Sequence, residues 1–180
     1  MILGITSHGH PKSTGPPDID NKKEIETMTD TVAFERSHDI LIDAPAKAVL
    51  DYVSNPNSWP EWIAASHEMD SPDRPLVVGD TFCEQWHTRT GPAELNWRVT
   101  ECQSPHLWIA ETGTDFLGLI IARYDVVSVG DQVRYTRTIQ NPARAKAPTA
   151  EMIERIDAEA KVSLENIKRN VEARVAAGTL

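Results

Sequence analysis

Glu84 lies between two aromatic residues in the segment GDTFCEQWHT. Alternate residues of an extended chain point to the same face, so Glu84 is predicted to share a face with Phe82 and Trp86. An apolar neighbourhood favours the protonated form of a carboxylic acid, which makes Glu84 the best candidate for a general acid or base. A salt bridge at a pocket rim, to an arginine of a neighbouring strand, is the competing interpretation.

Four other polar residues could take part in chemistry. Arg123 and Arg137 could polarise a substrate carbonyl or hold a carboxylate through paired hydrogen bonds, whereas exposed sheet arginines would do neither. Tyr135 could donate a hydrogen bond to a phenol or ketone oxygen, although a strand tyrosine is commonly a core residue. His67 could act as a base at a cavity mouth, or be an exposed histidine.

Other chemistries lack their usual residue patterns. The six histidines have no paired spacing, and the two cysteines, Cys83 and Cys102, lack metal-type spacing and are expected to be reduced thiols. No glycine-rich phosphate loop, nucleophile elbow or HExxH motif occurs in the sequence. We therefore expect no metal and no cofactor.

Strand-length segments with alternating hydrophobicity would carry these candidates. Turn signals separate them, which favours an antiparallel meander, and a slip of one residue would reverse every assignment of face. The predicted strands span residues 32–43, 79–88, 93–103, 106–114, 119–128 and 132–141.

Helices are predicted at both ends of this series. APAKAVLDYV reads as a helix with Pro45 in its first turn, and NPNSWPEWIAA as a second short helix whose tryptophans pack into one end of the sheet. Residues 149–178 carry apolar residues every three or four positions, which predicts an amphipathic helix of roughly 45 Å lying across the sheet. Its stripe consists of Ile153, Ile156, Ala160, Leu164, Ile167, Val171 and Val175.

The more apolar face of each strand is expected to face the long helix. The residues predicted to bind a substrate there are Trp59, Trp62, Phe82, Trp86, Trp97 and Trp108, together with Arg123.

The composition limits the class of protein. The chain of 180 residues is expected to form one domain, residues 31–180, after a polar extension of residues 1–30. A net charge of −9 without a basic stripe argues against a nucleic-acid partner. No run of roughly 20 apolar residues and no signal sequence is visible, so a cytoplasmic protein without a membrane span is expected. The strand at residues 32–43 could pair between chains to form a homodimer.

The order of these segments, with the motifs IDAPAKAVLDYV, WPEW, WRVTECQSPHLW and SLENIKRNVEAR, resembles the START-related SRPBCC superfamily. Within it, the chain is similar to the polyketide cyclase/dehydrase and lipid-transport group. The resemblance covers about residues 34–176 and implies an α+β helix-grip fold, in which a curved antiparallel sheet wraps a long C-terminal helix. It also implies a cavity for a hydrophobic or aromatic small molecule.

Fold alone does not decide activity, so three hypotheses stand. The first is a cyclase or dehydratase acting on a hydrophobic, polyketide-like or aromatic molecule. The second is a carrier or sensor of a lipid or aromatic metabolite. The third is an interaction module that contacts a protein partner through the acidic C-terminal helix or the N-terminal extension.

Overall fold

The computed structural model describes residues 31–63, 67–88, 91–115 and 117–180. The predicted extension, residues 1–30, lies outside the described residues. In the described part, no helix is long and apolar enough to cross a membrane.

Seven strands form one antiparallel sheet in the order β1-β7-β6-β5-β4-β3-β2. Consecutive strands from β2 to β7 are neighbours, and β1 joins β7, so β1 and β2 form the two edges. The strands are β1 (Val32–Ile42), β2 (His67–Asp70), β3 (Thr81–Thr88), β4 (Gly91–Gln103), β5 (Leu107–Thr114), β6 (Gly118–Val129) and β7 (Gln132–Arg144).

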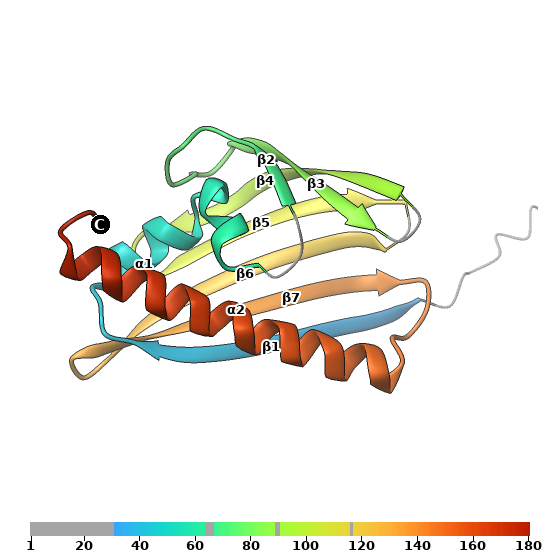
Figure 1. Cartoon of the computed structure of the whole chain (residues 1–180). Helices are drawn as coiled ribbons and strands as arrows, with labels where there is room; N and C mark the ends of the chain where they lie inside the picture. The colour runs from blue at the N-terminus through green and yellow to red at the C-terminus, as the bar shows by residue number, and fades with distance from the viewer. Residues whose placement is uncertain (1–30, 64–66, 89–90, 116) are drawn as a thin grey trace, which may run out of the picture.

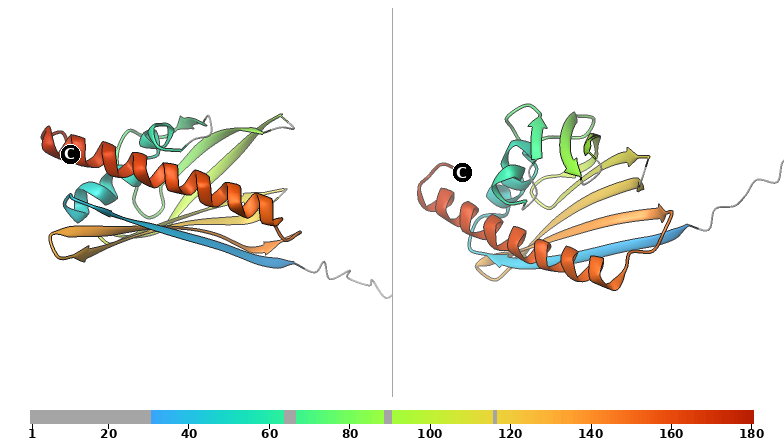
Figure 2. Two further views of the ribbon diagram at one scale, coloured as in Figure 1. Left: turned by 60° about the horizontal axis from the view of Figure 1, so that its bottom comes forward. Right: turned by 45° about the vertical axis from the view of Figure 1, so that its right-hand side comes forward.

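The sheet curves, and the helical segments lie on its concave side (Figures 1 and 2). Strand β4 shows the sequence pattern behind this: Leu95, Trp97 and Val99 are buried, whereas the intervening residues are exposed. Alternation of this kind is the pattern of a sheet with one face packed on a core and the other in solvent. All the predicted strands are confirmed. Strand β2 was not predicted from the sequence, because its segment HEMD contains a single apolar residue.

Two short helical segments follow β1: α1 (Ala46–Val53) and the 3-10 helix η1 (Pro56–Glu61). Pro45, predicted in the first helical turn, lies one position earlier, at the N-cap. The Asn55 side chain caps η1 by accepting the backbone N–H of Asn57 at 3.2 Å. These segments cover one end of the concave face.

The long helix α2 (Ala150–Ala176) lies across the concave face (Figure 1). The hydroxyl of Thr149 accepts the backbone N–H of Met152 at 3.2 Å, which satisfies one free donor of the first turn. The buried residues of α2 are Ala160, Ser163, Leu164, Ile167 and Val171. The predicted apolar stripe is therefore buried in its middle, and its ends, Ile153, Ile156 and Val175, are half-buried. The predicted helix-grip fold is therefore confirmed.

Candidate functional site

A cavity of about 360 Å³ lies between the concave face of the sheet, η1 and the first half of α2. Pockets for small molecules commonly fall in the range of roughly 300–1,000 Å³. Trp59, Trp86, Trp97 and Tyr124 form its aromatic wall, and Ile156, Ala160 and Ser163 line it from α2. The cavity is therefore large enough for a small organic molecule with an apolar or aromatic body.

Trp59 is the centre of an aromatic cluster at the end of the cavity. It is 2% exposed, and its ring contacts Phe82 and Trp97 with centroid distances of 5.3 and 5.9 Å. Its indole N–H donates to the backbone carbonyl of Val53 at 3.0 Å. The proline-rich segment around Trp59 thus packs its tryptophan side chain against the aromatic residues at this end of the sheet.

Glu84 is buried in the cavity wall between two tryptophans. The Trp86 indole N–H donates to Oε1 at 2.9 Å, and the Trp97 indole N–H donates to Oε2 at 2.8 Å. Trp86 shares the face of β3 with Glu84, and Trp97 comes from β4, where Leu95 is the direct partner of Glu84. Two rigid donors on two strands therefore fix the orientation of this carboxyl group.

Arg137 and Tyr124 lie on the neighbouring strands β7 and β6, where they are direct partners. The Arg137 guanidinium carbon lies 5.5 Å from the centroid of the Trp62 ring, and its buried Nε has no hydrogen-bond partner among the described residues. Burial raises the pKa of Tyr124 to about 12, while the charge and hydrogen bonding of Arg137 act in the opposite direction. Tyr124 therefore keeps its phenolic proton at neutral pH.

A second polar group ties β1 to α2 beside the cavity. Asp157 accepts two hydrogen bonds from the Arg36 guanidinium, one of them from Nε at 2.9 Å, and its Oδ1 lies 2.8 Å from His38 Nε2. The hydrogen bond from Arg36 lowers the pKa of Asp157. This contact explains why Arg36 and His38, both cavity-lining, lie at inward positions of an otherwise apolar pattern.

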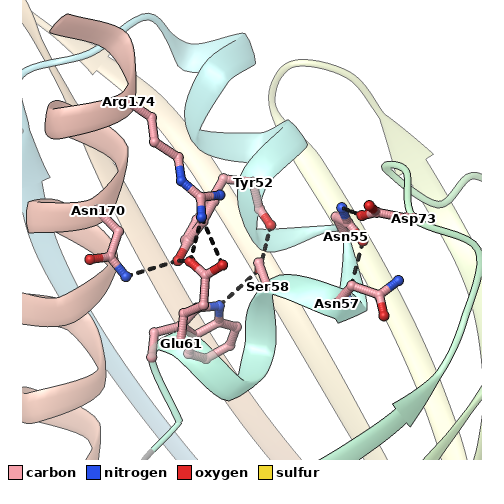
Figure 3. Close-up of polar contacts among 9 residues, drawn as sticks. Tyr52, Asn55, Asn57, Ser58, Glu61, Asp73, Asn170 and Arg174 are labelled. Atoms are coloured by element: carbon pink, nitrogen blue, oxygen red, sulfur yellow. Dashed lines mark hydrogen bonds and ion pairs between the residues drawn. The ribbon is translucent and has the colours of Figure 1, made fainter. Parts of the chain in front are cut away.

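A further network fixes η1 against the C-terminal half of α2 (Figure 3). The Tyr52 hydroxyl donates to Glu61 at 2.8 Å and accepts from the Asn170 amide at 3.0 Å. Arg174 donates to both oxygens of Glu61, at 2.7 and 2.8 Å. The segment that carries Trp59 is thus bonded to the helix that covers the cavity.

In the same described ranges, no group of three or more His, Cys, Asp and Glu residues is arranged to hold a metal ion.

Comparison with known proteins decides the family. The model of the family described as polyketide cyclase / dehydrase and lipid transport matches residues 32–172. The chain belongs to this polyketide cyclase/dehydrase family. The matched residues run from the start of β1 into the last turns of α2, so they include every wall of the cavity. No curated protein sequence gives a significant match.

Solved structures share the fold of this polyketide cyclase/dehydrase family member. The ZhuI aromatase/cyclase from Streptomyces sp. R1128 has a TM-score of 0.63 and 14% identity, over 83% of this chain and 100% of that one. The di-domain ARO/CYC BexL of the BE-7585A biosynthetic pathway has a TM-score of 0.59 and 19% identity, over 79% of this chain and 51% of that one. The Aha1 dimer from Colwellia psychrerythraea has a TM-score of 0.56 and 14% identity, over 77% and 96%. At such low identities these likenesses establish the fold alone.

Nine of the eleven predicted site residues fall into two groups, and His67 and Arg123 fall into neither. Those that line the cavity are Glu84, Arg137, Trp59, Trp86 and Trp97. Those that are buried behind its wall or beside it are Trp62, Phe82, Trp108 and Tyr135. Of the second group, the Tyr135 hydroxyl is buried without a hydrogen-bond partner in the described residues, and the Trp108 indole donates to the backbone of Leu76 at 3.0 Å. His67 forms part of β2 opposite Trp86, and its side chain lies outside the described residues.

The prediction that Arg123 faces the pocket is wrong. On β6 the buried residues are Ile120, Ala122, Tyr124 and Val126, so Arg123 lies on the opposite face. There its guanidinium donates two hydrogen bonds to Asp125, at 2.8 and 2.6 Å. Alternate residues of β6 point to opposite faces of the sheet. Both charged residues of this strand, Arg123 and Asp125, lie on the face turned away from the core.

Tyr124 is one of the cavity residues that sequence reasoning missed, and Arg144 is another. The signal was present, because Tyr124 shares its parity with the apolar Ala122 and Val126. Choosing the face by apolarity, as was done for the other strands, would have placed Tyr124 in the cavity.

Proposed function

We propose that the protein is a cyclase- or dehydratase-type enzyme that acts on a hydrophobic, polyketide-like or aromatic small molecule bound in the cavity. The observation that carries this proposal is that an acidic and a basic side chain, Glu84 and Arg137, line one cavity that also has an aromatic wall. Membership of the polyketide cyclase/dehydrase family supports the same reading.

In the proposed mechanism, the aromatic wall holds a flexible substrate in a folded conformation, so that reacting carbons meet. Glu84 takes a proton from a carbon next to a carbonyl, and the electron pair of that C–H bond moves onto the carbonyl oxygen. Arg137 and the Tyr124 hydroxyl donate hydrogen bonds to the resulting enolate. The enolate carbon attacks a second carbonyl carbon, and the alkoxide formed there takes the proton held by Glu84. Glu84 then removes the remaining hydrogen from the attacking carbon, the electron pair of that C–H bond forms a C=C bond, and the hydroxyl group leaves as water with the proton returned by Glu84.

The alternative is a carrier or sensor that binds such a molecule without turnover. The observation that favours it is the pair of indole donors on Glu84, because both carboxyl oxygens already accept a hydrogen bond. A carboxyl group held in this way could serve only to orient the tryptophans of the wall.

Native mass spectrometry of the purified protein tests for a bound hydrophobic molecule and identifies it. That molecule is then incubated with the wild type and with Glu84→Gln and Arg137→Ala variants. An enzyme requires that the variants lose turnover while Glu84→Gln still binds. Loss of binding without any turnover in the wild type would favour the carrier, and a protein that retains and accepts no hydrophobic molecule would overturn both.

A further inference from the structure

The arginines of this acidic protein differ in their partners. Six of the described arginines each pair with a carboxylate, and the pairs are Arg36–Asp157, Arg74–Asp80, Arg123–Asp125, Arg134–Asp39, Arg155–Glu159 and Arg174–Glu61. Arg137 and Arg144 both line the cavity, and neither forms an ion pair with any other described residue. Among the carboxylates of the described residues, the two cavity arginines thus have no ion-pair partner.

In the described part of the chain, Arg144 packs against the ring of Phe34 and the sulfur of Met152. Its guanidinium carbon lies 5.6 Å from the centroid of the Phe34 ring, and one guanidinium nitrogen lies 3.5 Å from the Met152 sulfur. Stacking on an aromatic face leaves the edge of a guanidinium group, where its N–H donors lie, available to a planar carboxylate. Arg144 is therefore a preformed partner for an anion.

The position of Arg144 distinguishes it from Arg137. Arg144 is the last residue of β7 and follows the exposed residues Pro142 and Ala143, so it lies at the mouth of the cavity. Arg137 lies seven residues earlier on β7 and contacts the buried Trp62 ring. A cavity with one arginine inside and one at its mouth suits an elongated molecule with an oxygen at each place.

Glu84 decides which oxygen carries the charge. Burial is the main cause that raises the pKa of Tyr124, and the charge of Glu84 also raises it, so Glu84 lies within electrostatic range of the direct β6 partner of Arg137. A carboxylate deep in the cavity would share a water-poor space with the carboxyl group of Glu84, where like charges repel strongly. The anionic group is therefore favoured at the mouth, and a neutral carbonyl or phenol oxygen is favoured at Arg137.

We infer that the ligand is a hydrophobic carboxylate whose acid group lies against Arg144 at the mouth of the cavity. This inference rests on the proposed function, in that it requires a small hydrophobic molecule in the cavity. It adds the charge of that molecule and the end by which it is held.

Isothermal titration of the full-length protein with decanoate and with decanol tests the inference, since the two probes share a chain and differ in charge. The wild type is expected to bind decanoate about tenfold more tightly than decanol, because one hydrogen-bonded charge pair contributes about this factor. Arg144→Gln should abolish the preference and leave the affinity for decanol unchanged. Arg144→Lys should keep part of the preference, and Arg98→Gln, a change on the exposed face of β4, should keep all of it.

Equal affinities of the wild type for the two probes would overturn the inference and leave the proposed cavity function standing. The same holds if Arg144→Gln keeps the preference or weakens both probes equally. Binding of neither probe would overturn the inference together with the cavity function on which it rests.

Discussion

The indole N–H of Trp97 on β4 donates to Glu84 Oε2 on β3 at 2.8 Å, and both side chains are almost completely buried. When a buried carboxyl oxygen loses its hydrogen-bond donor, the free energy lost by removing that oxygen from water is no longer offset by the bond. The expected cost is about 1–3 kcal/mol. The hydrogen bond therefore couples the stability of the cavity wall to the group proposed to perform the chemistry.

A double-mutant cycle measures this coupling. Trp97→Phe should keep the stacked contact with Phe82, whose centroid lies 6.0 Å away, and remove the donor. We combine this change with Glu84→Gln and measure the free energy of unfolding in urea. The coupling energy between the two substitutions is expected to be on the order of 1 kcal/mol. If the two changes are additive, the hydrogen bond does not stabilise the fold.

The buried tyrosines predict the behaviour of the protein in alkali. Burial raises the pKa of Tyr124 from 10.0 to about 12 and that of Tyr135 well above its usual value. Because folding raises these pKa values, the stabilisation is complete below pH 10 and is lost as the pH rises through the folded values. The ultraviolet absorbance of tyrosinate should therefore rise only together with unfolding, and Tyr124→Phe should unfold less steeply with pH. Tyrosinate formation near pH 10 in a protein that keeps its native circular dichroism would contradict this.

Ser58 should be important for the segment that carries Trp59. Its hydroxyl donates to the backbone carbonyl of Tyr52 at 2.7 Å and accepts the Trp62 indole N–H at 3.1 Å, and it is 4% exposed (Figure 3). Ser58→Ala leaves both groups buried without this partner, so we expect a loss of about 1–3 kcal/mol in urea unfolding. Ser128→Ala, a change at an exposed position of β6, is the control and should alter stability by less than about 0.5 kcal/mol.

The tie between β1 and α2 predicts an effect in acid. The hydrogen bond from Arg36 lowers the pKa of Asp157 below 3.8, so the pair stabilises the fold above that pH and its contribution is lost as the pH falls through the folded pKa. Asp157→Asn should therefore lower the urea midpoint at neutral pH and flatten its decline in acid, whereas Asp131→Asn at an exposed turn should not. An unchanged pH profile would show that this pair contributes no stability.

The two faces of the sheet can be separated by a pair of arginine variants. Arg137→Gln removes a charge that lines the cavity. The variant should bind the ligand identified by native mass spectrometry with about tenfold lower affinity. Arg123→Gln removes a charge on the outer face and should leave that affinity unchanged. Equal effects of the two variants would contradict the assignment of faces.

Much of the fold could be predicted from the sequence, because strand alternation and the helical stripe are local signals. The strand that was missed, β2, has four residues and only Met69 as an apolar position, so its pairing with β3 depends on tertiary contacts. The prediction that Arg123 faces the cavity was wrong because the face of β6 was not chosen by its apolar residues. Ala122 and Val126 are buried on the opposite face.

The candidate site could be predicted only in part. The residues Glu84, Trp86 and Trp97 were identified by type and parity, but the hydrogen bond between Glu84 and Trp97 spans 13 positions of sequence. It depends on the register of the β3–β4 hairpin, in which Phe82 opposes Trp97, and on side-chain rotation, neither of which a local pattern determines. The isolation of Arg144 from every described carboxylate likewise depends on the whole arrangement of charges.

The placement of Trp59, Trp86 and Trp97 around one hollow gives the protein its own optical probe. Three of its five tryptophans line that space. Trp86 is the half-buried one of the three, so an occupant that displaces water from its ring should move its fluorescence to shorter wavelengths, and filling of the hollow can be followed in unlabelled protein.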